Sequence, residues 1–219
     1  MAGVSKANWS DLSIRIASAL VMAGLALATA WWGGPLFALF WFLAAAAVLC
    51  EWLFLIAGGR RDWLIVALGA GLLAVSTVLA QSGQGGAALL TVLGGAAVMG
   101  GLAWGRGAMQ PLLVAAALPY AACVVLPATL LRLDEPYGMR AIFVLFAIVW
   151  GSDVLAYFTG RTFGGPKLWP RVSPKKTWSG FIGGTVFAAL AVPGANNGAA
   201  KIKGIASLRR ILILRDFLR

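Results

Sequence analysis

The chain has 219 residues, of which 61% are hydrophobic and 11% charged, with no His and a formal net charge of +11. Soluble globular proteins carry about 25% charged residues, so this composition excludes a water-soluble enzyme, and it is too apolar for a disordered chain. The lack of His also excludes catalysis by a Ser–His or Cys–His pair and metal sites with imidazole ligands.

Six segments are long and apolar enough for transmembrane helices, which need about 20 mostly apolar residues. In chain order they are residues 16–32, 35–56, 63–80, 87–104, 111–131 and 141–158. A seventh begins at Gly180 but ends near Pro193, too short to span the membrane unaided. The predicted fold class is therefore all-α, a polytopic membrane helix bundle of six transmembrane helices plus a partial seventh. A cleaved signal peptide is the alternative for the first segment, although further spans follow it at once.

Lys and Arg are divided unevenly between the two sides of this arrangement. One side holds Lys6, Arg15, Arg60, Arg61, Arg106, Arg161, Lys167, Arg171, Lys175 and Lys176. The other holds Arg132 and Arg140, with Asp134 and Glu135 beside them. The positive-inside rule then makes the N-terminus and the basic loop after the sixth segment cytoplasmic. The net charge is explained by such loops and by anionic lipid, and nucleic acid is not an expected partner.

Small and sulfur-containing residues within the spans allow simple interpretations. Cys50 and Cys123 lie in apolar runs without C-x-x-C spacing, so we expect buried, unpaired thiols. Two pairs have the small-xxx-small spacing that permits close helix contact: Ala96 with Gly100, and Gly180 with Gly184. We interpret them as packing within the bundle rather than as a dimer motif.

Two acidic residues, Glu51 and Asp153, lie inside predicted spans near their cytoplasmic ends. A carboxylate at the centre of a span costs about 2.5–3.5 kcal/mol on insertion scales, so an intramembrane acid normally has a partner or a function. Glu51 either reaches toward the interface or has a functional role. For Asp153 the alternatives are a salt bridge to another helix and a functional site.

The segment after Asp153 is basic and rich in turn-forming residues. Residues 157–180 contain five cations, four Gly and three Pro, and no acid. Gly lets backbone N–H groups approach a ligand, and Lys and Arg bind phosphate. Thr177 is the predicted N-cap of a helix that begins near Trp178, and that helix N-terminus would favour an anion beside Lys175 and Lys176. We predict an anion site in a cytoplasmic basic loop at residues 159–179; the alternative is a loop that only binds lipid headgroups.

Two stretches closely resemble motifs of the phosphatidate cytidylyltransferases, also called CDP-diacylglycerol synthases. They read SDVLAYFTGRTFG at residues 152–164 and SPKKTWSG at residues 173–180. The CEW sequence at residues 50–52 is similar to an acidic–Trp pair in an early span of these enzymes. The resemblance covers roughly residues 10–190, and the stretch from Asp153 to Gly180 is its specific part.

The resemblance implies a nucleotidyltransferase of phospholipid biosynthesis in a bacterial inner (plasma) membrane. Such an enzyme transfers CMP from CTP to phosphatidate, gives CDP-diacylglycerol and pyrophosphate, and uses Mg²⁺. On this basis Asp153 is the expected catalytic residue and metal ligand. The expected substrate-binding residues are Arg161, Lys167, Ser173, Lys175, Lys176 and Thr177. A homodimer is also implied by the family.

The chain departs from the family pattern at three places. Val154-Leu155 replaces Thr-Gly, Ser179 replaces Glu, and a C-terminal signature containing PGHGG and DRxD is absent from these residues. We predict two parts: residues 1–190 form the transmembrane bundle, and residues 191–219 form an atypical basic tail. The tail is interpreted as the out-of-frame or truncated end of a longer gene, with a helix on the anionic membrane surface as the alternative.

Other functions stay open from sequence alone. A CTP-dependent lipid kinase would use the same nucleotide but release CDP. An inactive truncated remnant would retain only the binding of anionic lipid, because the missing signature supplies further carboxylates. A transporter or channel would show polar residues in several spans, and only Glu51 and Asp153 interrupt these spans with charge.

Overall fold

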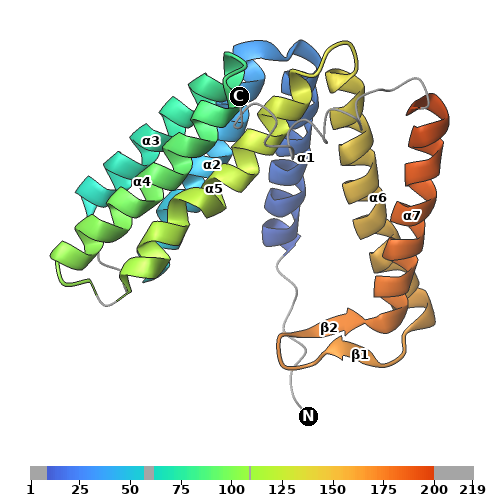
Figure 1. The fold of residues 1–219 in the computed structure, drawn as a ribbon. Helices are drawn as coiled ribbons and strands as arrows, with labels where there is room; N and C mark the ends of the chain where they lie inside the picture. The colour runs from blue at the N-terminus through green and yellow to red at the C-terminus, as the bar shows by residue number, and fades with distance from the viewer. Residues whose placement is uncertain (1–8, 57–61, 109, 200–219) are drawn as a thin grey trace.

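The computed structural model describes residues 9–56, 62–108 and 110–199. Within these ranges the chain forms seven helices and one two-stranded antiparallel hairpin, arranged as in Figure 1. The elements are α1 (Trp9–Trp32), α2 (Gly34–Ile56), α3 (Trp63–Gln81), α4 (Gly85–Gly105), α5 (Pro111–Arg132), α6 (Gly138–Phe163), β1 (Lys167–Trp169), β2 (Ser173–Thr177) and α7 (Trp178–Ala199).

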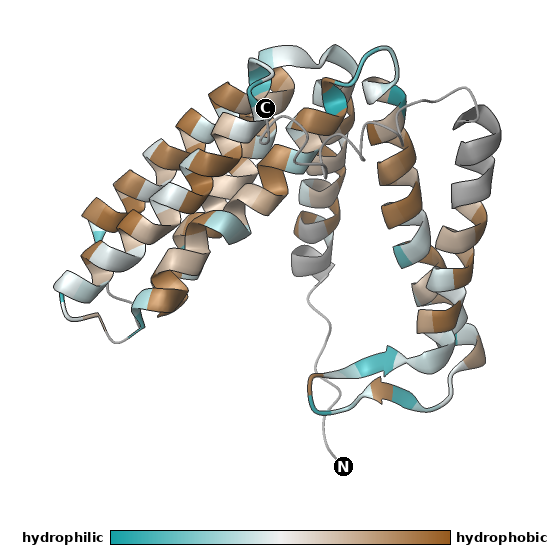
Figure 2. Cartoon of the chain, in the orientation of Figure 1, coloured by the Kyte–Doolittle hydropathy of each residue, from teal (hydrophilic) through white to brown (hydrophobic). Residues whose placement is uncertain are grey.

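Five of these helices, α2 to α6, are long and apolar enough to cross a membrane. The corresponding apolar stretches in α1 and α7 are shorter, Ile16–Trp32 and Trp178–Ala191. Apolar residues run along the helices, while polar residues gather at their ends and on the hairpin (Figure 2). The prediction of an all-α polytopic membrane bundle is confirmed. Some predictions fall on residues that the structure does not describe. These are the cytoplasmic cations Lys6, Arg60 and Arg61 and most of the basic tail, residues 200–219.

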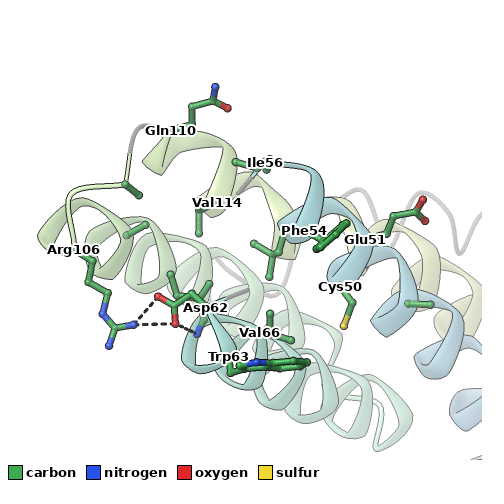
Figure 3. A pocket seen from close by; sticks show the side chains of 15 residues that line it. Cys50, Glu51, Phe54, Ile56, Asp62, Trp63, Val66, Arg106, Gln110 and Val114 are labelled. Carbon is green, nitrogen blue, oxygen red and sulfur yellow. Dashed lines mark hydrogen bonds and ion pairs between the residues drawn. The ribbon is translucent and has the colours of Figure 1, made fainter. Parts of the chain in front are cut away.

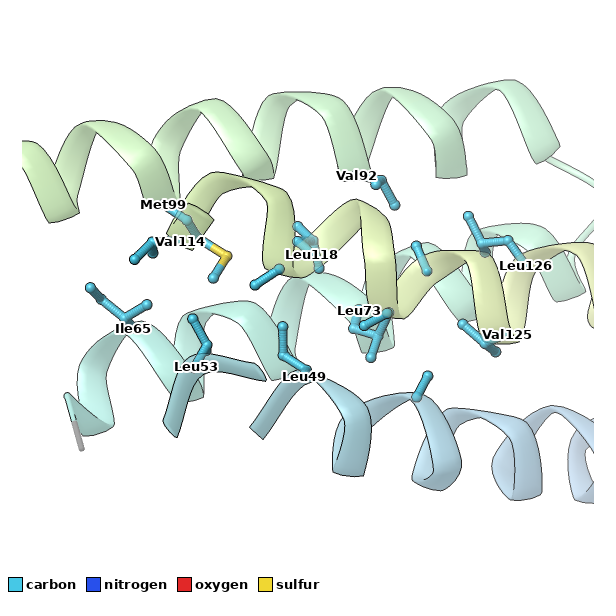
Figure 4. Close-up of a cluster of buried hydrophobic side chains, with 14 of the residues drawn as sticks. Leu49, Leu53, Ile65, Leu73, Val92, Met99, Val114, Leu118, Val125 and Leu126 are labelled. Atoms are coloured by element: carbon cyan, nitrogen blue, oxygen red, sulfur yellow. The ribbon is translucent and has the colours of Figure 1, made fainter. Parts of the chain in front are cut away.

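The core of the bundle is formed by α2, α3, α4 and α5. Its largest fully buried side chains come from all four helices and belong to one cluster, which Figure 4 shows: Leu49, Leu73, Met99, Leu118 and Val125. Close approach of these helices is possible because glycines lie where the helices meet. A Cβ on Gly100, for example, would lie 2.9 Å from Cβ of Ala115. This contact supports the interpretation of small residues as packing within the bundle.

A second, smaller cluster joins α1 and α6 to the bundle through Ala30, Phe37, Ile142 and Phe146. The rings of Phe146 and Trp41 lie 6.2 Å apart. At the same end of the molecule, the Arg132 guanidinium donates to the carbonyl oxygen of Ala30 at 2.8 Å. This arginine therefore satisfies a carbonyl left free at the end of α1.

The two cysteines do not lie where the sequence predicted them. Cys50 and Cys123 are both exposed on the surface of the bundle, so the expectation of buried thiols is wrong. The reason is that lipid tails are as apolar as a helix interface, and an apolar sequence does not show which helix face contacts protein. Both thiols are unpaired, as expected.

We call the end of the molecule at which the hairpin lies the hairpin end (Figure 1). An ion pair at this end joins the start of α3 to the end of α4. Nη1 of Arg106 lies 2.9 Å from Oδ2 of Asp62. Oδ1 of the same carboxylate accepts from the backbone N–H groups of Leu64 at 3.1 Å and Ile65 at 3.4 Å. Asp62 is thus both the N-cap of α3 and its link to the end of α4.

Replacing Asp62 with Ala is expected to lower the free energy of unfolding by about 1–2 kcal/mol, since both the cap and the ion pair are lost. Replacing Arg106 with Gln removes only the half-exposed ion pair and is expected to lower it by less than about 1 kcal/mol. Thermal unfolding of both variants in the same lipid nanodiscs shows which variant loses more stability. A larger loss in the Arg106 variant would contradict the dual role of Asp62.

Candidate functional site

The residues of the SDVLAYFTGRTFG and SPKKTWSG stretches lie on α6, the hairpin and the start of α7. The structure differs from the predicted loop at residues 159–179, because α6 and α7 occupy its two ends. Helix α6 continues to Phe163, five residues beyond the predicted end of the span, and the hairpin fills the rest of the connection. Gly164 and Gly165 permit the reversal, with φ angles of +59° and +99° that favour glycine.

Helices α6 and α7 pack together through small residues at these motifs. A Cβ on Gly180 would lie 2.7 Å from the carbonyl oxygen of Ala156 and 3.3 Å from Cα of Gly160. One turn further along α7, a Cβ on Gly184 would lie 2.9 Å from the carbonyl oxygen of Ser152. The backbones of the two motifs therefore nearly touch, and the pair Gly180 and Gly184 serves packing within the chain, as interpreted from the sequence.

Thr177 forms the predicted cap of α7. Its Oγ1 accepts a hydrogen bond from the backbone N–H of Gly180 at 3.3 Å, and the helix begins at Trp178. The side chain is buried against Gly160 of α6. The hydroxyl of Ser179 donates to the carbonyl oxygen of Gly164 at 2.5 Å. The first turn of α7 is therefore tied to the reversal after α6.

The hairpin register sets the positions of the basic side chains. Lys167 pairs with Thr177 and Trp169 with Ser173, so β2 has more residues between these pairs than β1. Lys175 and Lys176 lie in this irregular part of β2, and both are exposed. Bulges of this kind redirect side chains and are frequent beside active sites.

Asp153, Tyr157 and Arg161 lie on one face of α6, because they are four residues apart. Nη1 of Arg161 donates to the Tyr157 hydroxyl at 2.9 Å, and the guanidinium carbon is 6.0 Å from the centre of its ring. Eight residues of helix separate Asp153 from Arg161 by about 12 Å along the axis. All three side chains are exposed, on a face different from the one that packs on α7.

Asp153 has no salt bridge among the side chains that the structure describes. Within the same ranges no group of three or more His, Cys, Asp or Glu side chains is arranged to hold a metal ion. Asp153 is thus the one carboxylate that α6, the hairpin and the described part of α7 offer to Mg²⁺. This fits an ion that takes one or two protein carboxylates and otherwise binds phosphate oxygens and water.

Glu51 lies elsewhere, beside a cavity of about 780 Å³ at the hairpin end of the α2–α5 bundle (Figure 3). Most of the lining side chains are apolar, and the Asp62–Arg106 pair is part of the wall. No residue of α6, the hairpin or α7 lines this cavity. Glu51 is exposed, so both interpretations of it stay open, but the structure does not bring it into the site around Asp153.

The sequence-predicted site residues are therefore partly brought together. Thr177, Ser173 and Lys167 share the hairpin register, and Arg161 lies in the last turn of α6 that leads to the hairpin. Tyr157, which orients Arg161, was not among the predicted site residues. Its four-residue spacing from Arg161 in the sequence was a signal that could have identified it.

Comparison with known proteins places these residues in a family context. The model of the cytidylyltransferase family matches residues 13–198. A protein of Brucella abortus (strain 2308) named phosphatidate cytidylyltransferase is 43% identical over 188 residues, which cover 84% of this chain and 66% of the relative. A protein of the same name from Bacillus subtilis is 47% identical over 57 residues, covering 26% of this chain and 21% of the relative. One from Haemophilus influenzae is 40% identical over 92 residues, covering 39% and 31%.

The alignment therefore spans slightly less than two thirds of the length of the Brucella relative. No solved structure matches the chain.

Proposed function

The chain belongs to the cytidylyltransferase family, and from this membership we propose that it transfers CMP from CTP to phosphatidate at the cytoplasmic face of a bacterial inner membrane. The observation that carries the proposal is the family match over residues 13–198, which includes the whole α6–hairpin–α7 unit. The products are CDP-diacylglycerol and pyrophosphate. The orientation follows from the positive-inside rule, because the cations of the hairpin gather at one end of the helices.

In the proposed reaction an oxygen of the phosphatidate phosphate attacks the α-phosphorus of CTP. A new P–O bond forms while the bond between the α-phosphorus and the bridging oxygen breaks, and pyrophosphate leaves with that electron pair. Two polyanions must approach each other, so the protein contributes mainly positioning and positive charge.

The residues of this chain divide that work between α6 and the hairpin. Asp153 is the residue that would hold Mg²⁺, which neutralises triphosphate charge when bound. Arg161 binds a phosphate with its guanidinium oriented by Tyr157, to which it donates at 2.9 Å. The remaining predicted residues are Lys167, Lys175 and Lys176 as phosphate ligands, and Ser173 and Thr177 as residues that shape the hairpin.

A lipid substrate suits this location. The hairpin begins at the end of the membrane-spanning helix α6 and leads into the apolar stretch of α7, so its cations lie at the depth of lipid headgroups rather than far from the bilayer. A homodimer, which the resemblance implies, is part of the proposal; native mass spectrometry of the chain released from lipid is expected to show two copies.

The reaction is tested with the purified chain in nanodiscs that contain phosphatidate, supplied with Mg²⁺ and with CTP labelled at either the α- or the γ-phosphate. Transfer of CMP carries the α label into the lipid fraction and the γ label into pyrophosphate. Chelation of Mg²⁺ is expected to stop both. Transfer of the γ label to lipid would instead identify a CTP-dependent lipid kinase. If neither the α label nor the γ label reached the lipid, the proposal would be contradicted.

A further inference from the structure

The tip of the hairpin, residues 169–172, combines two exposed apolar side chains with a cation. Trp169 is 64% exposed and Val172 is 73% exposed, and Arg171 between them is also exposed. The tip is a tight turn, in which the backbone N–H of Val172 donates to the carbonyl oxygen of Trp169 at 3.1 Å. The proposed reaction does not use these three residues, so their exposure needs another explanation.

The charge around the tip has one sign. The hairpin strands carry Lys167, Lys175 and Lys176, and the sequence contains no acidic residue between Asp153 and Asp216. A solvated loop usually mixes both signs. A surface of cations with an exposed Trp matches the headgroup layer of an anionic bilayer, where phosphates attract Lys and Arg and the indole ring lies at the interface.

Aromatic residues mark the depth of that interface at the hairpin end. Trp63 begins α3, Trp104 is in the last turn of α4, Phe163 ends α6 and Trp178 begins α7, and all four are exposed. Because successive helices run antiparallel, these positions lie at the same end of the molecule. The hairpin thus leaves α6 and enters α7 at the level of an aromatic belt.

The direction of the hairpin keeps its tip near this level. Figure 1 shows the two strands running across the helix axes, under the side of the molecule where α1 lies, instead of extending the line of α6 and α7. The five residues of β2 span at most about 17 Å, so the tip remains close to the ends of the membrane helices.

We propose that the hairpin tip docks on the headgroup layer of an anionic bilayer, with Trp169 and Val172 at the boundary between headgroups and acyl chains and Arg171 on lipid phosphates. The hairpin then lies along the membrane surface. This docking involves neither nucleotide nor Asp153, so it stands or falls separately from the proposed reaction.

The experiment places a nitroxide spin label on Val172→Cys in a chain whose exposed Cys50 and Cys123 are replaced by Ser. Nanodiscs of phosphatidylglycerol with phosphatidylethanolamine are compared with nanodiscs of phosphatidylcholine alone. Accessibility of the label to a water-soluble nickel chelate and to oxygen, which concentrates in the membrane, reports its depth. In anionic nanodiscs we expect low access for nickel and high access for oxygen.

Two charge variants provide the matched comparison. Arg171→Gln is expected to shift the equilibrium between docked and undocked tip about fivefold toward the undocked form, which raises nickel access. Arg140→Gln removes the same charge from an exposed position at the opposite end and is expected to leave the label unchanged. Both side chains are exposed, so neither change disturbs packing.

Three results would overturn the docking. One is nickel access that is equally high in anionic and zwitterionic nanodiscs. Another is an equal effect of the two arginine variants. The third is shielding of the label that appears only in nanodiscs with two copies of the chain, since the tip would then contact protein rather than lipid.

Discussion

Replacing Asp153 with Asn is expected to reduce CMP transfer to phosphatidate at least about 100-fold, the usual effect of losing one group that stabilises charge in the transition state. The amide has the same shape but no negative charge, so it binds Mg²⁺ poorly. The side chain is exposed and has no salt bridge within the described ranges, so the fold should not change.

The measurement is the initial rate of CDP-diacylglycerol formation as a function of Mg²⁺ concentration. The Asp153 variant is expected to need a higher Mg²⁺ concentration to reach half of its own maximal rate. A purely structural role of Asp153 would not cause this shift. Glu135→Gln is the control, because it removes an exposed carboxylate from the connection between α5 and α6 at the opposite end. An Asp153 variant with the activity and the Mg²⁺ dependence of the unchanged chain would refute the assignment.

Replacing Gly180 with Ala is expected to separate α6 from α7 and to destabilise the chain by about 1–3 kcal/mol, the usual range for overpacking. The added Cβ would lie 2.7 Å from the carbonyl oxygen of Ala156, a backbone atom that cannot rotate away. The same position is where Thr177 caps α7, so the hairpin should move with the helix. CMP transfer should fall together with stability.

The matched control is Gly94→Ala in α4, where an added Cβ would meet no atom within 4 Å. Alanine also favours a helix over glycine, so this variant is expected to be neutral or slightly more stable. Thermal unfolding in nanodiscs compares the two, and a destabilisation of this size lowers the midpoint by about 2–4 °C for each kcal/mol. Equal midpoints for the two variants would show that the close crossing of α6 and α7 is not needed for stability.

The sequence by itself predicted the membrane-spanning segments closely. The second, third, fourth and fifth predicted spans differ from α2, α3, α4 and α5 by at most two residues at either end. The reason is that hydrocarbon offers backbone groups no hydrogen-bond partner, so a long apolar segment must satisfy them internally as a helix. The cap at Thr177 was equally predictable, because a cap depends on residues only three positions apart.

The sequence predicted which residues belong to the candidate site better than it predicted how they are arranged. The motifs indicated the candidate residues Asp153, Arg161, Lys167, Ser173, Lys175, Lys176 and Thr177. The family match supports the resemblance from which they were taken. The hairpin was not predicted, because its strands are short and irregular in register and give no alternation of polar and apolar residues. Glu51 was considered together with Asp153, yet its helix places it beside a different cavity.

Tertiary structure alone decided which helix faces meet and which distant residues pair. Asp62 and Arg106 are 44 positions apart, and nothing in their local sequence indicates that the start of α3 lies beside the end of α4. Cys50 and Cys123 face outward although both lie in long apolar segments. In a membrane, hydropathy defines each helix, but it cannot orient the helices about their axes, because lipid and protein interior are equally apolar. Steric fit, such as that of Gly180 against Ala156, makes that choice.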